Sequence, residues 1–536
     1  MNGLAPTMSR SKSTGRTTVC GSLLAIGVGL IVASASSNPG REGGVFRIAG
    51  VPDAIDPAIT LDAEDALSAS CVQLMNYPDK SVPEGTRVVP EAAAGYPHVS
   101  PNGKTYTFTI RGGFRFSTGE EVTAASFAHE INRMLSPVMN SPWVQYVQDI
   151  VGADAVRNGT ATAASGVVVR GNKLIIRLTH PARDFPARTA FFGFCAVPAD
   201  LPISAEGVDT LPGAGPYTVS EFVPSQKLVL TRNPFYRGSR PHHVDEIDYA
   251  SAPDPVQAVE SGAADYAELV SPVDVVGLDP KYRSQLHSVP GIGVQYVILN
   301  SAQPLFKDNA PLRQAVNFAL DRPALRQARG GALTGSLTDQ YLPPSMPGFV
   351  DAHIYPLHHP DLKRAKALAR GHTRSGRAML YVRDMPIDIV QAQIIQRDLK
   401  PIGIDVVIKK LPGPALFQLL FTPGSHYDLS VFGFSPDYWD PYAVLNVLFD
   451  GRMIGTPYSF DIGYFDSPKY NTLLDADSRL TGSARYRAYG KLDVDLVRNA
   501  APMVAYESDS ALSFVSKRVG CIVLNPYLDL ASACLR

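Results

Sequence analysis

Hydrophobic and polar residues alternate in several short segments of the chain, which predicts β-strands. In GGVFRIAG, residues 43–50, Phe46 and Ile48 would share one face of a strand. Three aromatic or aliphatic residues alternate with three threonines in residues 105–110, and this pattern predicts a half-buried strand. Residues 166–178 contain two alternating runs on either side of a Gly-Asn pair, so they predict a β-hairpin.

A helical period appears further along the chain. Residues 309–320 carry apolar side chains at four-residue intervals, which predicts a helix with Asn309 as its N-cap. Pro323 interrupts this pattern, and Asp321 can cap a second short helix. We therefore expect two consecutive helices over residues 309–325.

Residues 386–408 predict a helix followed by a strand. The inward face of the helix is expected to consist of Ile387, Val390, Ile394 and Leu399. Pro401 and Gly403 end the helix, and apolar residues alternate over 404–408 as in a strand. Together, these elements predict a mixed α/β protein with more than one domain.

Length and composition favour two or three globular domains. The chain has 536 residues, and a single hydrophobic core stops growing at roughly 250–300 residues. A hydrophobic content of 45% and a charged content of 18% argue against a disordered chain. The net charge of −1 argues against nucleic acid as a partner, because phosphate recognition needs clustered lysines and arginines.

The N-terminal segment has the layout of a secretory signal peptide. Basic residues between positions 10 and 16 precede an apolar run from Leu23 to Ala33, and Ala33 and Ala35 form an A-x-A cleavage site. The run is short for a membrane span, which takes roughly 20 residues, but an uncleaved anchor is the alternative. No later stretch is long and apolar enough to span a membrane. We therefore expect the mature protein outside the cytoplasm.

Four cysteines follow the predicted signal peptide: Cys71, Cys195, Cys521 and Cys534. An even number of cysteines in an exported chain predicts disulfides. Cys521 and Cys534 are close in sequence and are the first predicted pair, and Cys71 with Cys195 is the second. Buried free thiols are the alternative for each pair.

Catalytic and metal-binding signatures are incomplete. HEINR, residues 129–133, begins like the helix of a zinc protease, but Arg133 stands where the second histidine ligand is needed. GFSPD, residues 433–437, lacks the closing glycine of a nucleophile elbow. The adjacent histidines at 242–243 and 358–359 fit surface or capping roles better than one shared metal. We predict no catalytic residue, no metal site and no cofactor.

The segment SPDYWDPY, residues 435–442, is the most distinctive candidate site. Asp437 and Asp440 are either the acid pair of a hydrolase, the charged wall of a binding pocket, or the ends of a turn. An acid pair must hold two carboxylates across a substrate with separated pKa values. Asp440 precedes a proline and can cap the helix predicted in PYAVLNVLF. Tyr438 and Trp439 can belong to a pocket or to the core.

Five segments, in chain order, resemble the extracytoplasmic solute-binding proteins of ABC importers, family 5, which include peptide- and nickel-binding members. They are GGVFRIAGVPDAIDPA (43–58), the stretches 89–135, 299–325 and 399–411, and GAGPYTVSEFVPSQKLVLTRNPFYRG (213–238). The last of these matches a Gly-x-Gly-Pro-Tyr to Arg-Asn-Pro-x-Tyr pattern and is the most specific. The resemblance covers roughly residues 41–536. Leu305, Lys307 and Trp439 depart from the family pattern, in ways that bear on ligand choice.

The resemblance implies a two-lobed periplasmic-binding-protein fold, type II, of the large peptide-binding class, whose lobes close on the ligand like a clamshell. The implied parts are a signal peptide or anchor (1–35), a linker (36–42), lobe I (43–65, 186–299 and 504–536), an inserted subdomain of lobe I (66–185) and lobe II (300–503). The protein would be a monomer.

The resemblance also implies a function and its residues. In peptide-binding members, the acid of a G-[WF]-x-x-D-Y-like stretch pairs with the α-amino group of the peptide, and Asp437 occupies that position in GFSPDYWDPY. Tyr438, Trp439 and Phe434 would line the same site. The implied protein is a receptor without enzymatic activity that delivers peptides, or similar cationic solutes, to a membrane permease. The alternatives are a non-peptide ligand (a nickel chelate, haem, an oligosaccharide or an opine) and, more remotely, a secreted hydrolase.

Overall fold

The computed structural model describes residues 41–536, apart from residues 270–277, 279, 457–458 and 526–527. The predicted signal peptide or anchor (1–35) and residues 36–40 of the predicted linker lie outside the described residues. Within the described part of the chain, no helix has the length and apolar character needed to cross a membrane.

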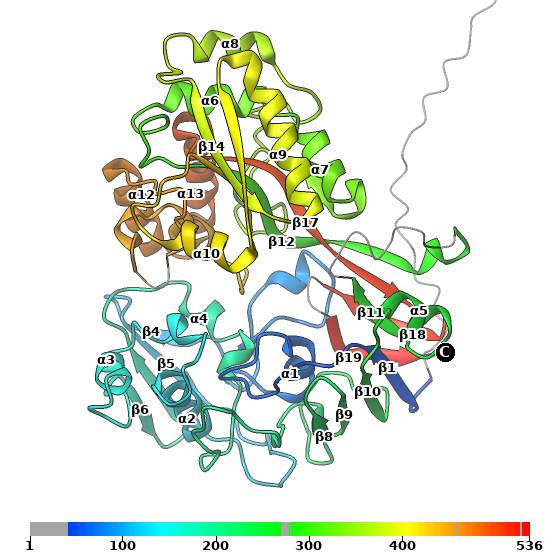
Figure 1. Ribbon diagram of the computed structural model, residues 1–536. Helices are drawn as coiled ribbons and strands as arrows, with labels where there is room; N and C mark the ends of the chain where they lie inside the picture. The colour runs from blue at the N-terminus through cyan, green and yellow to red at the C-terminus, as the bar shows by residue number, and fades with distance from the viewer. Residues whose placement is uncertain (1–40, 270–277, 279, 457–458, 526–527) are drawn as a thin grey trace, which may run out of the picture. The chain divides into compact units, whose positions relative to one another are not determined.

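One mixed sheet of eleven strands connects much of the described chain (Figure 1). Its strands, in their order across the sheet, are β15 (Asp405–Leu411), β14 (Arg377–Arg383), β16 (Leu429–Phe434), β12 (Leu286–Leu299), β17 (Met503–Val515), β11 (Tyr266–Leu269), β1 (Val45–Ala49), β10 (Glu246–Ala250), β9 (Lys227–Arg232) and β8 (Tyr217–Val223), and β13 (Gly335–Leu337) pairs with β17. The strand predicted at 43–50 is β1. It buries Phe46 and Ile48, as predicted, and lies between two parallel neighbours, β10 and β11.

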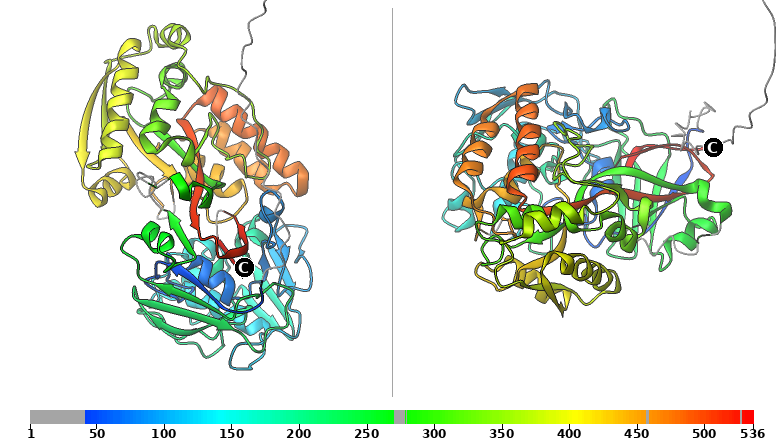
Figure 2. Two further views of the ribbon diagram at one scale, coloured as in Figure 1. Left: turned by 90° about the vertical axis from the view of Figure 1, so that its right-hand side faces the viewer. Right: turned by 90° about the horizontal axis from the view of Figure 1, so that it is seen from above.

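Two large hydrophobic cores lie on different parts of this sheet. The first core is built from buried side chains of residues 46–266 and 515–535. The second core is built from buried side chains of residues 292–506. Strands β12 and β17 pair with each other and run from one core to the other, as Figures 1 and 2 show. The chain thus enters the second core along β12 and leaves it along β17.

The crossing between the two cores is irregular. The register of β12 against β17 shifts after Pro290 and again after Gln295. A Cβ atom at Gly291 would lie 2.8 Å from the carbonyl oxygen of Asp509 on β17, closer than real Cβ contacts come. The missing side chain of Gly291 therefore allows the backbones of β12 and β17 to approach closely where their register shifts.

A second sheet, of four strands, belongs to the first core. Its strands, in order, are β4 (His98–Val99), β5 (Thr105–Thr109), β7 (Lys173–Arg177) and β6 (Val167–Arg170). The strand and the hairpin predicted from alternation are thereby confirmed, and Gly171 has the positive φ of 57° that the hairpin turn requires. This sheet lies within the predicted inserted subdomain, 66–185. The boundaries of the subdomain and of the two lobes stay predictions.

Helices pack on the main sheet, on the four-stranded sheet and on one another. They are α1 (Glu64–Ser70), α2 (Ala124–Leu135), α3 (Ala153–Arg157), α4 (Phe185–Arg188), α5 (Pro255–Glu260), α6 (Ala310–Ala319), α7 (Arg322–Arg329), α8 (Leu362–Ala369), α9 (Pro386–Leu399), α10 (Gly413–Phe421), α11 (Tyr442–Phe449), α12 (Pro468–Arg479) and α13 (Gly482–Asp495). The two helices predicted over 309–325 are α6 and α7. The side chain of Asp321 caps α7 as predicted, accepting a hydrogen bond from the backbone N–H of Ala324 at 3.0 Å.

The predicted cap of α6 is wrong in its chemistry. Asn309 precedes the helix, but its side chain makes no capping bond. Its amide group instead donates to the carbonyl oxygens of Leu305 and His372, each at 2.8 Å. The amide is therefore used to hold two loops together.

The predicted inward face of α9 is also wrong in part. Leu399 is buried, but Val390 is 45% exposed. Polar residues take part of the buried face: Asp388 forms an ion pair with Arg383 at 2.6 Å, and Gln391 donates to the hydroxyl of Tyr506 at 2.8 Å. Because satisfied polar groups can be buried, the apolar pattern alone marked the wrong face.

Two disulfides connect the cysteine pairs predicted from the sequence. Cys71, just after α1, is bonded to Cys195, 124 positions away. Cys521 on β18 (Val519–Leu524) is bonded to Cys534 on β19 (Leu528–Leu535), 13 positions away, and the two residues lie opposite each other in the strand pair. All four cysteines belong to elements of the first core or to the hairpin beside it.

Candidate functional site

The segment 435–441 connects β16 to α11, both of which belong to the second core. Asp440 lies two residues before α11, and its carboxylate accepts a hydrogen bond from the backbone N–H of Tyr442, the first residue of the helix, at 2.9 Å. The same carboxylate forms a buried ion pair with Arg485 of α13, at 2.5 and 2.7 Å. Asp440 therefore has the helix-capping role that was one of its two predicted interpretations, and it anchors α11 to α13.

Asp437 has a different environment. Its side chain is half-buried, and its carboxylate accepts a hydrogen bond from the hydroxyl of Tyr146, which belongs to the first core. Within the described residues, no Lys, Arg or His forms an ion pair with it. Burial raises the pKa of Asp437, and the Tyr146 hydroxyl opposes this shift. The carboxylate therefore lacks the cation that would normally accompany a partly buried charge.

Tyr438 and Trp439 are almost fully buried, with 3% of each exposed. The Tyr438 hydroxyl donates to Asp184 at 2.8 Å, and the backbone N–H of Trp439 donates to the hydroxyl of Tyr77 at 3.1 Å. With the Tyr146–Asp437 bond, three consecutive residues of the segment between β16 and α11 are hydrogen-bonded to residues 77–184. Tyr438 also lines one cavity and Trp439 another, so each residue both makes structural contacts and contributes to a cavity wall.

A small cavity of about 70 Å³, which we call the acidic cavity, lies beside Asp437. Its lining includes Glu64 at the start of α1, Trp439, and the carboxylates of Asp79 and Asp529. Glu64 is half-buried and forms no ion pair within the described chain. Burial and the nearby charge of Asp437 raise its pKa well above the ordinary value. Asp437 and Glu64 thus line one small cavity without ion pairs of their own in the described chain, whereas Arg240, which also lines it, pairs with Asp79 and Asp529.

Sequence reasoning missed Glu64. The only signal was its place in LDAED, a run of acids shortly after the Asp-Pro element at 56–57. The run also supplies Asp62 and Asp65 to a neighbouring cavity of about 410 Å³, which includes Glu268 as well. Burial raises the pKa of Asp65 to about 6. Within the described residues, none of these acids has an ion-pair partner, so the surroundings of Asp437 favour positive charge.

A larger cavity of about 690 Å³, which we call the aromatic cavity, lies on the other side of Asp437. Its aromatic lining residues are Trp143, Tyr146, Phe417, Phe432, Phe434, Tyr438, Tyr442 and Phe460. Phe434 is half-buried at the end of β16, three residues before Asp437. The structure therefore places the predicted residues Phe434, Asp437 and Tyr438 around one cavity, with Trp439 on the adjoining acidic cavity.

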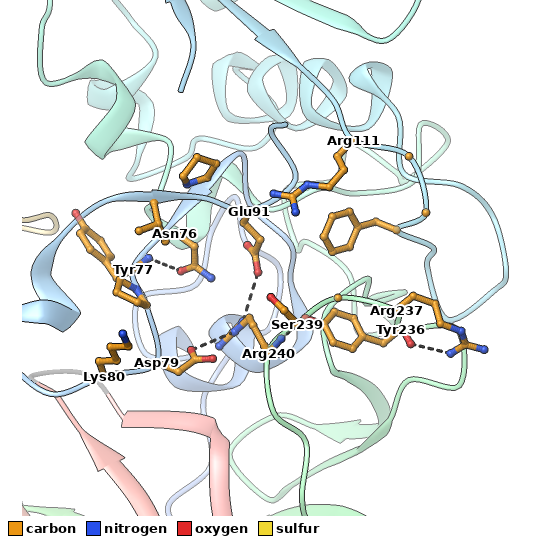
Figure 3. Close-up of a pocket in the computed structure, with 17 residues that line it drawn as sticks. Asn76, Tyr77, Asp79, Lys80, Glu91, Arg111, Tyr236, Arg237, Ser239 and Arg240 are labelled. Atoms are coloured by element: carbon orange, nitrogen blue, oxygen red, sulfur yellow. Dashed lines mark hydrogen bonds and ion pairs between the residues drawn. The ribbon is translucent and has the colours of Figure 1, made fainter. Parts of the chain in front are cut away.

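An arginine-centred network supports the first-core side of the acidic cavity (Figure 3). The guanidinium of Arg240 lies between Asp79 at 3.3 Å and Glu91 at 3.8 Å, with Asp529 at 3.5 Å. Burial raises the pKa of Asp529 to about 7. The network fixes the loop that carries Tyr77, the residue that binds the backbone of Trp439.

No group of three or more potential metal ligands is present among the described residues. The incomplete zinc motif is explained by Arg133, whose guanidinium pairs with Asp56 at 2.5 Å and Glu130 at 2.7 Å inside the first core. His358 and His359 are exposed, and His243 pairs with Glu42 at the surface. These residues have structural or surface roles.

Comparison with known proteins decides which family has this arrangement. The model of the bacterial extracellular solute-binding proteins, family 5 (middle region), matches residues 87–455. The chain belongs to this family. The family is made up of solute-binding proteins rather than enzymes, and its description as extracellular implies a location outside the cytoplasm.

Two individual relatives align with most of this chain. A probable D,D-dipeptide-binding periplasmic protein of Escherichia coli (strain K12) is 26% identical over 503 residues, covering 90% of this chain and 92% of the relative. The oligopeptide-binding protein OppA of Bacillus subtilis (strain 168) is 25% identical over 421 residues, covering 74% of this chain and 75% of the relative. Both similarities extend across both cores.

The fold is shared with solved family-5 structures. The clavulanic acid biosynthesis oligopeptide binding protein 2 superposes with a TM-score of 0.84 at 24% identity, covering 92% of this chain and 96% of that chain. The predicted two-lobed α/β fold of the large solute-binding class is thereby confirmed. The two cores joined by β12 and β17 correspond to this two-lobed organisation.

Proposed function

We propose that this protein is the receptor of an ABC importer, that it binds peptides by their amino-terminal end, and that Asp437 is the anchor for the amine. The observation that carries the proposal is the pair of carboxylates, Asp437 and Glu64, which line the acidic cavity and form no ion pair within the described chain. A buried ammonium needs a paired carboxylate, and a partly buried carboxylate needs a cation. An ammonium group would satisfy both needs at once.

The family supports peptides as the ligand class. The two relatives described above carry names that refer to D,D-dipeptides and oligopeptides. We propose that this protein likewise takes peptides, acts as a monomer, catalyses no reaction and passes its ligand to a membrane permease. In this proposal residues 1–35 direct export as a signal peptide or anchor.

The position of Asp437 between the cores supports a closing mechanism. Asp437, Tyr438 and Trp439 lie on the segment between β16 and α11, and their hydrogen-bond partners, Tyr146, Asp184 and Tyr77, come from residues 77–184. We propose that the sequence-predicted lobes (43–299 with 504–536, and 300–503) close on the ligand about β12 and β17. An amine bound at Asp437 and Glu64 would draw the two lobes together.

The test uses Asp437→Asn, which keeps the size of the side chain and removes its charge. A mixture of short peptides with free amino termini is offered to the purified protein, and a peptide identified in the complex by native mass spectrometry is then titrated by calorimetry. If the amine is the partner, we expect the variant to lose about 2–5 kcal/mol of binding free energy. The melting temperature without ligand should not fall, because the lost charge is one that burial disfavours.

The matched control is Asp475→Asn, an exposed aspartate on α12 that pairs with Arg479 at 2.8 Å. This variant should bind the same peptide as tightly as the wild type. Equal affinity of Asp437→Asn and the wild type would disprove the amine anchor. Recovery of cleaved peptides would show a hydrolase, and recovery of a ligand that is not a peptide would disprove the peptide assignment.

A further inference from the structure

The aromatic cavity presents apolar surface that no part of the described chain covers. Phe417 of α10 is 51% exposed, and Phe432, Phe434 and Phe460 are half-buried. Leaving aromatic surface in contact with water is unfavourable, so these rings would gain by covering an apolar group. The cavity of about 690 Å³ also falls within the ordinary size range of ligand pockets, roughly 300–1,000 Å³.

Rings from two parts of the chain line the cavity. On the second-core side, Phe434 and Phe460 have centroids 5.2 Å apart, and Phe421, beneath the lining, connects Phe417 at 4.1 Å to Phe460 at 5.4 Å. The first core supplies Trp143 and Tyr146, whose rings stack with centroids 6.4 Å apart. An aromatic or bulky aliphatic group that entered the cavity would contact rings on both sides.

The charges around the cavity fix the orientation of such a ligand. Three aspartates line it, and two of them have cations: Asp149 pairs with Arg188 at 2.9 Å and Asp450 with Arg452 at 2.6 Å. Asp437 is the lining aspartate whose described partner is a neutral hydroxyl. A cationic group is therefore favoured at the Asp437 end of the cavity, and the apolar group must extend from there along the rings.

We propose that the peptide bound by this protein carries an aromatic or bulky aliphatic side chain on its first residue, and that this side chain occupies the aromatic cavity. The proposal rests on the proposed function, because it takes Asp437 as the position of the α-amino group. Phe434 and Asp437 are three residues apart on one segment. The amine and the side chain of a single N-terminal residue would thus meet neighbouring parts of the same wall.

The proposal is tested by calorimetry with three matched tripeptides, Phe-Ala-Ala, Ala-Ala-Phe and Ala-Ala-Ala. We expect Phe-Ala-Ala to bind at least tenfold more tightly than Ala-Ala-Ala, because it adds a ring beside the amine. Ala-Ala-Phe has the same composition with the ring at the other end, and we expect its affinity to stay within threefold of that of Ala-Ala-Ala.

A variant locates the ring in the protein. Phe417→Ser removes a half-exposed ring, so it should fold normally, and we expect it to reduce the preference for Phe-Ala-Ala over Ala-Ala-Ala at least threefold. The control is Phe235→Ser, which removes another exposed phenylalanine, 39% accessible and outside the cavity, and should leave the preference unchanged. Melting curves of both variants confirm folding.

The outcomes separate the two proposals. If tripeptides bind but Phe-Ala-Ala has no advantage, or if Ala-Ala-Phe shares the advantage, the side-chain assignment is overturned while the peptide receptor stands. A preference for Phe-Ala-Ala that Phe417→Ser leaves intact would overturn the assignment of the ring to this cavity. If none of the tripeptides or the wider peptide mixture binds, the proposed function fails, and this inference fails with it.

Discussion

At the scale of single residues, the neighbouring acids Asp437 and Asp440 show how environment separates roles. The carboxylate of Asp440 pairs with the guanidinium of Arg485 and accepts a hydrogen bond at the N-terminus of α11, so its charge is satisfied within the protein. The hydrogen-bond partner of Asp437 is a single neutral hydroxyl, that of Tyr146, and burial raises the pKa of Asp437. A carboxylate of the second kind costs folding free energy in its charged form, and this cost is repaid when a cation binds.

The hydroxyl of Tyr146 gives a prediction about pH. Asp437 must be ionised to hold an amine, so affinity is full above its pKa and is lost as the pH falls through that value. Burial puts this loss at a higher pH than the ordinary aspartate value of 3.8. The Tyr146 hydroxyl lowers the pKa of Asp437, so Tyr146→Phe should raise it and move the loss of affinity to a still higher pH. Calorimetry over a series of pH values measures the midpoint.

The control for this prediction is Tyr96→Phe, at a tyrosine that is 66% exposed. Its midpoint should equal that of the wild type, and an unshifted midpoint in Tyr146→Phe would contradict the prediction. The stability of the ligand-free protein depends on pH in the opposite direction to the affinity. Because the folded pKa of Asp437 is raised, its contribution to the free energy of unfolding becomes less favourable as the pH rises through the interval between the unfolded and folded pKa values.

At the scale of elements, the disulfides differ in the length of chain that they close. The bond between Cys71 and Cys195 spans 124 positions, and the bond between Cys521 and Cys534 spans 13. In the chain-entropy model, removing the disulfide that closes the longer loop costs about 5 kcal/mol of unfolding free energy, and removing the one that closes the shorter loop costs about 3 kcal/mol. We therefore expect the double variant Cys71→Ser/Cys195→Ser to be less stable than the double variant Cys521→Ser/Cys534→Ser, each of which keeps the other disulfide.

Denaturant unfolding of both double variants measures this difference. Each variant serves as the control for the other, because each replaces one disulfide and its two cysteines by two serines. Equal or reversed stabilities would contradict the loop-length argument. Thiol titration of the unfolded, unreduced wild type should find no reactive thiol at any of these four cysteines.

Elements with local patterns were predictable from the sequence, and the long-range parts of the site were not. The hairpin turn at Gly171 and the cap at Asp321 depend on residues two or three positions away. The partner of Asp437, in contrast, is Tyr146, 291 positions away. No periodicity or spacing connects such residues, so the sequence pointed to Asp437 through family resemblance and gave no indication of Tyr146.

Polar residues at buried positions explain the remaining errors. On α9 the buried face includes Asp388 and Gln391, whose partners come from β14 and β17. The sequence did not single out Glu64 of α1, whose importance follows from the proximity of Asp437. Burial and charge pairing are properties of the assembled fold, so neither face nor site could be assigned from these residues alone.

At the scale of the whole molecule, β12 and β17 are the paired strands that connect the two cores. The backbones are close where they cross, and Gly291→Ala would place a Cβ 2.8 Å from the carbonyl oxygen of Asp509. Because this contact is with backbone, the strands must shift. Overpacking of this kind costs about 1–3 kcal/mol, and we expect the variant to lose that much unfolding free energy and to bind its peptide more weakly.

Denaturant unfolding and calorimetry test this prediction together. Gly95→Ala is the matched control, because a Cβ at Gly95 would meet no atom within 4 Å. If Gly291→Ala were as stable as Gly95→Ala and bound the peptide equally well, the close approach of β12 and β17 would have no mechanical importance.

The two ends of the described fold meet at one place. The backbone N–H of Arg41 donates to the carbonyl oxygen of Leu535 at 2.8 Å. The first described residue of the chain therefore lies beside the last but one. A chain that joined Arg536 to Arg41 through a short linker and opened at the exposed loop around Gly371 would keep every strand pairing. The order in which the segments are encoded is therefore separable from the shape they build, and a permuted gene could specify the same binding site.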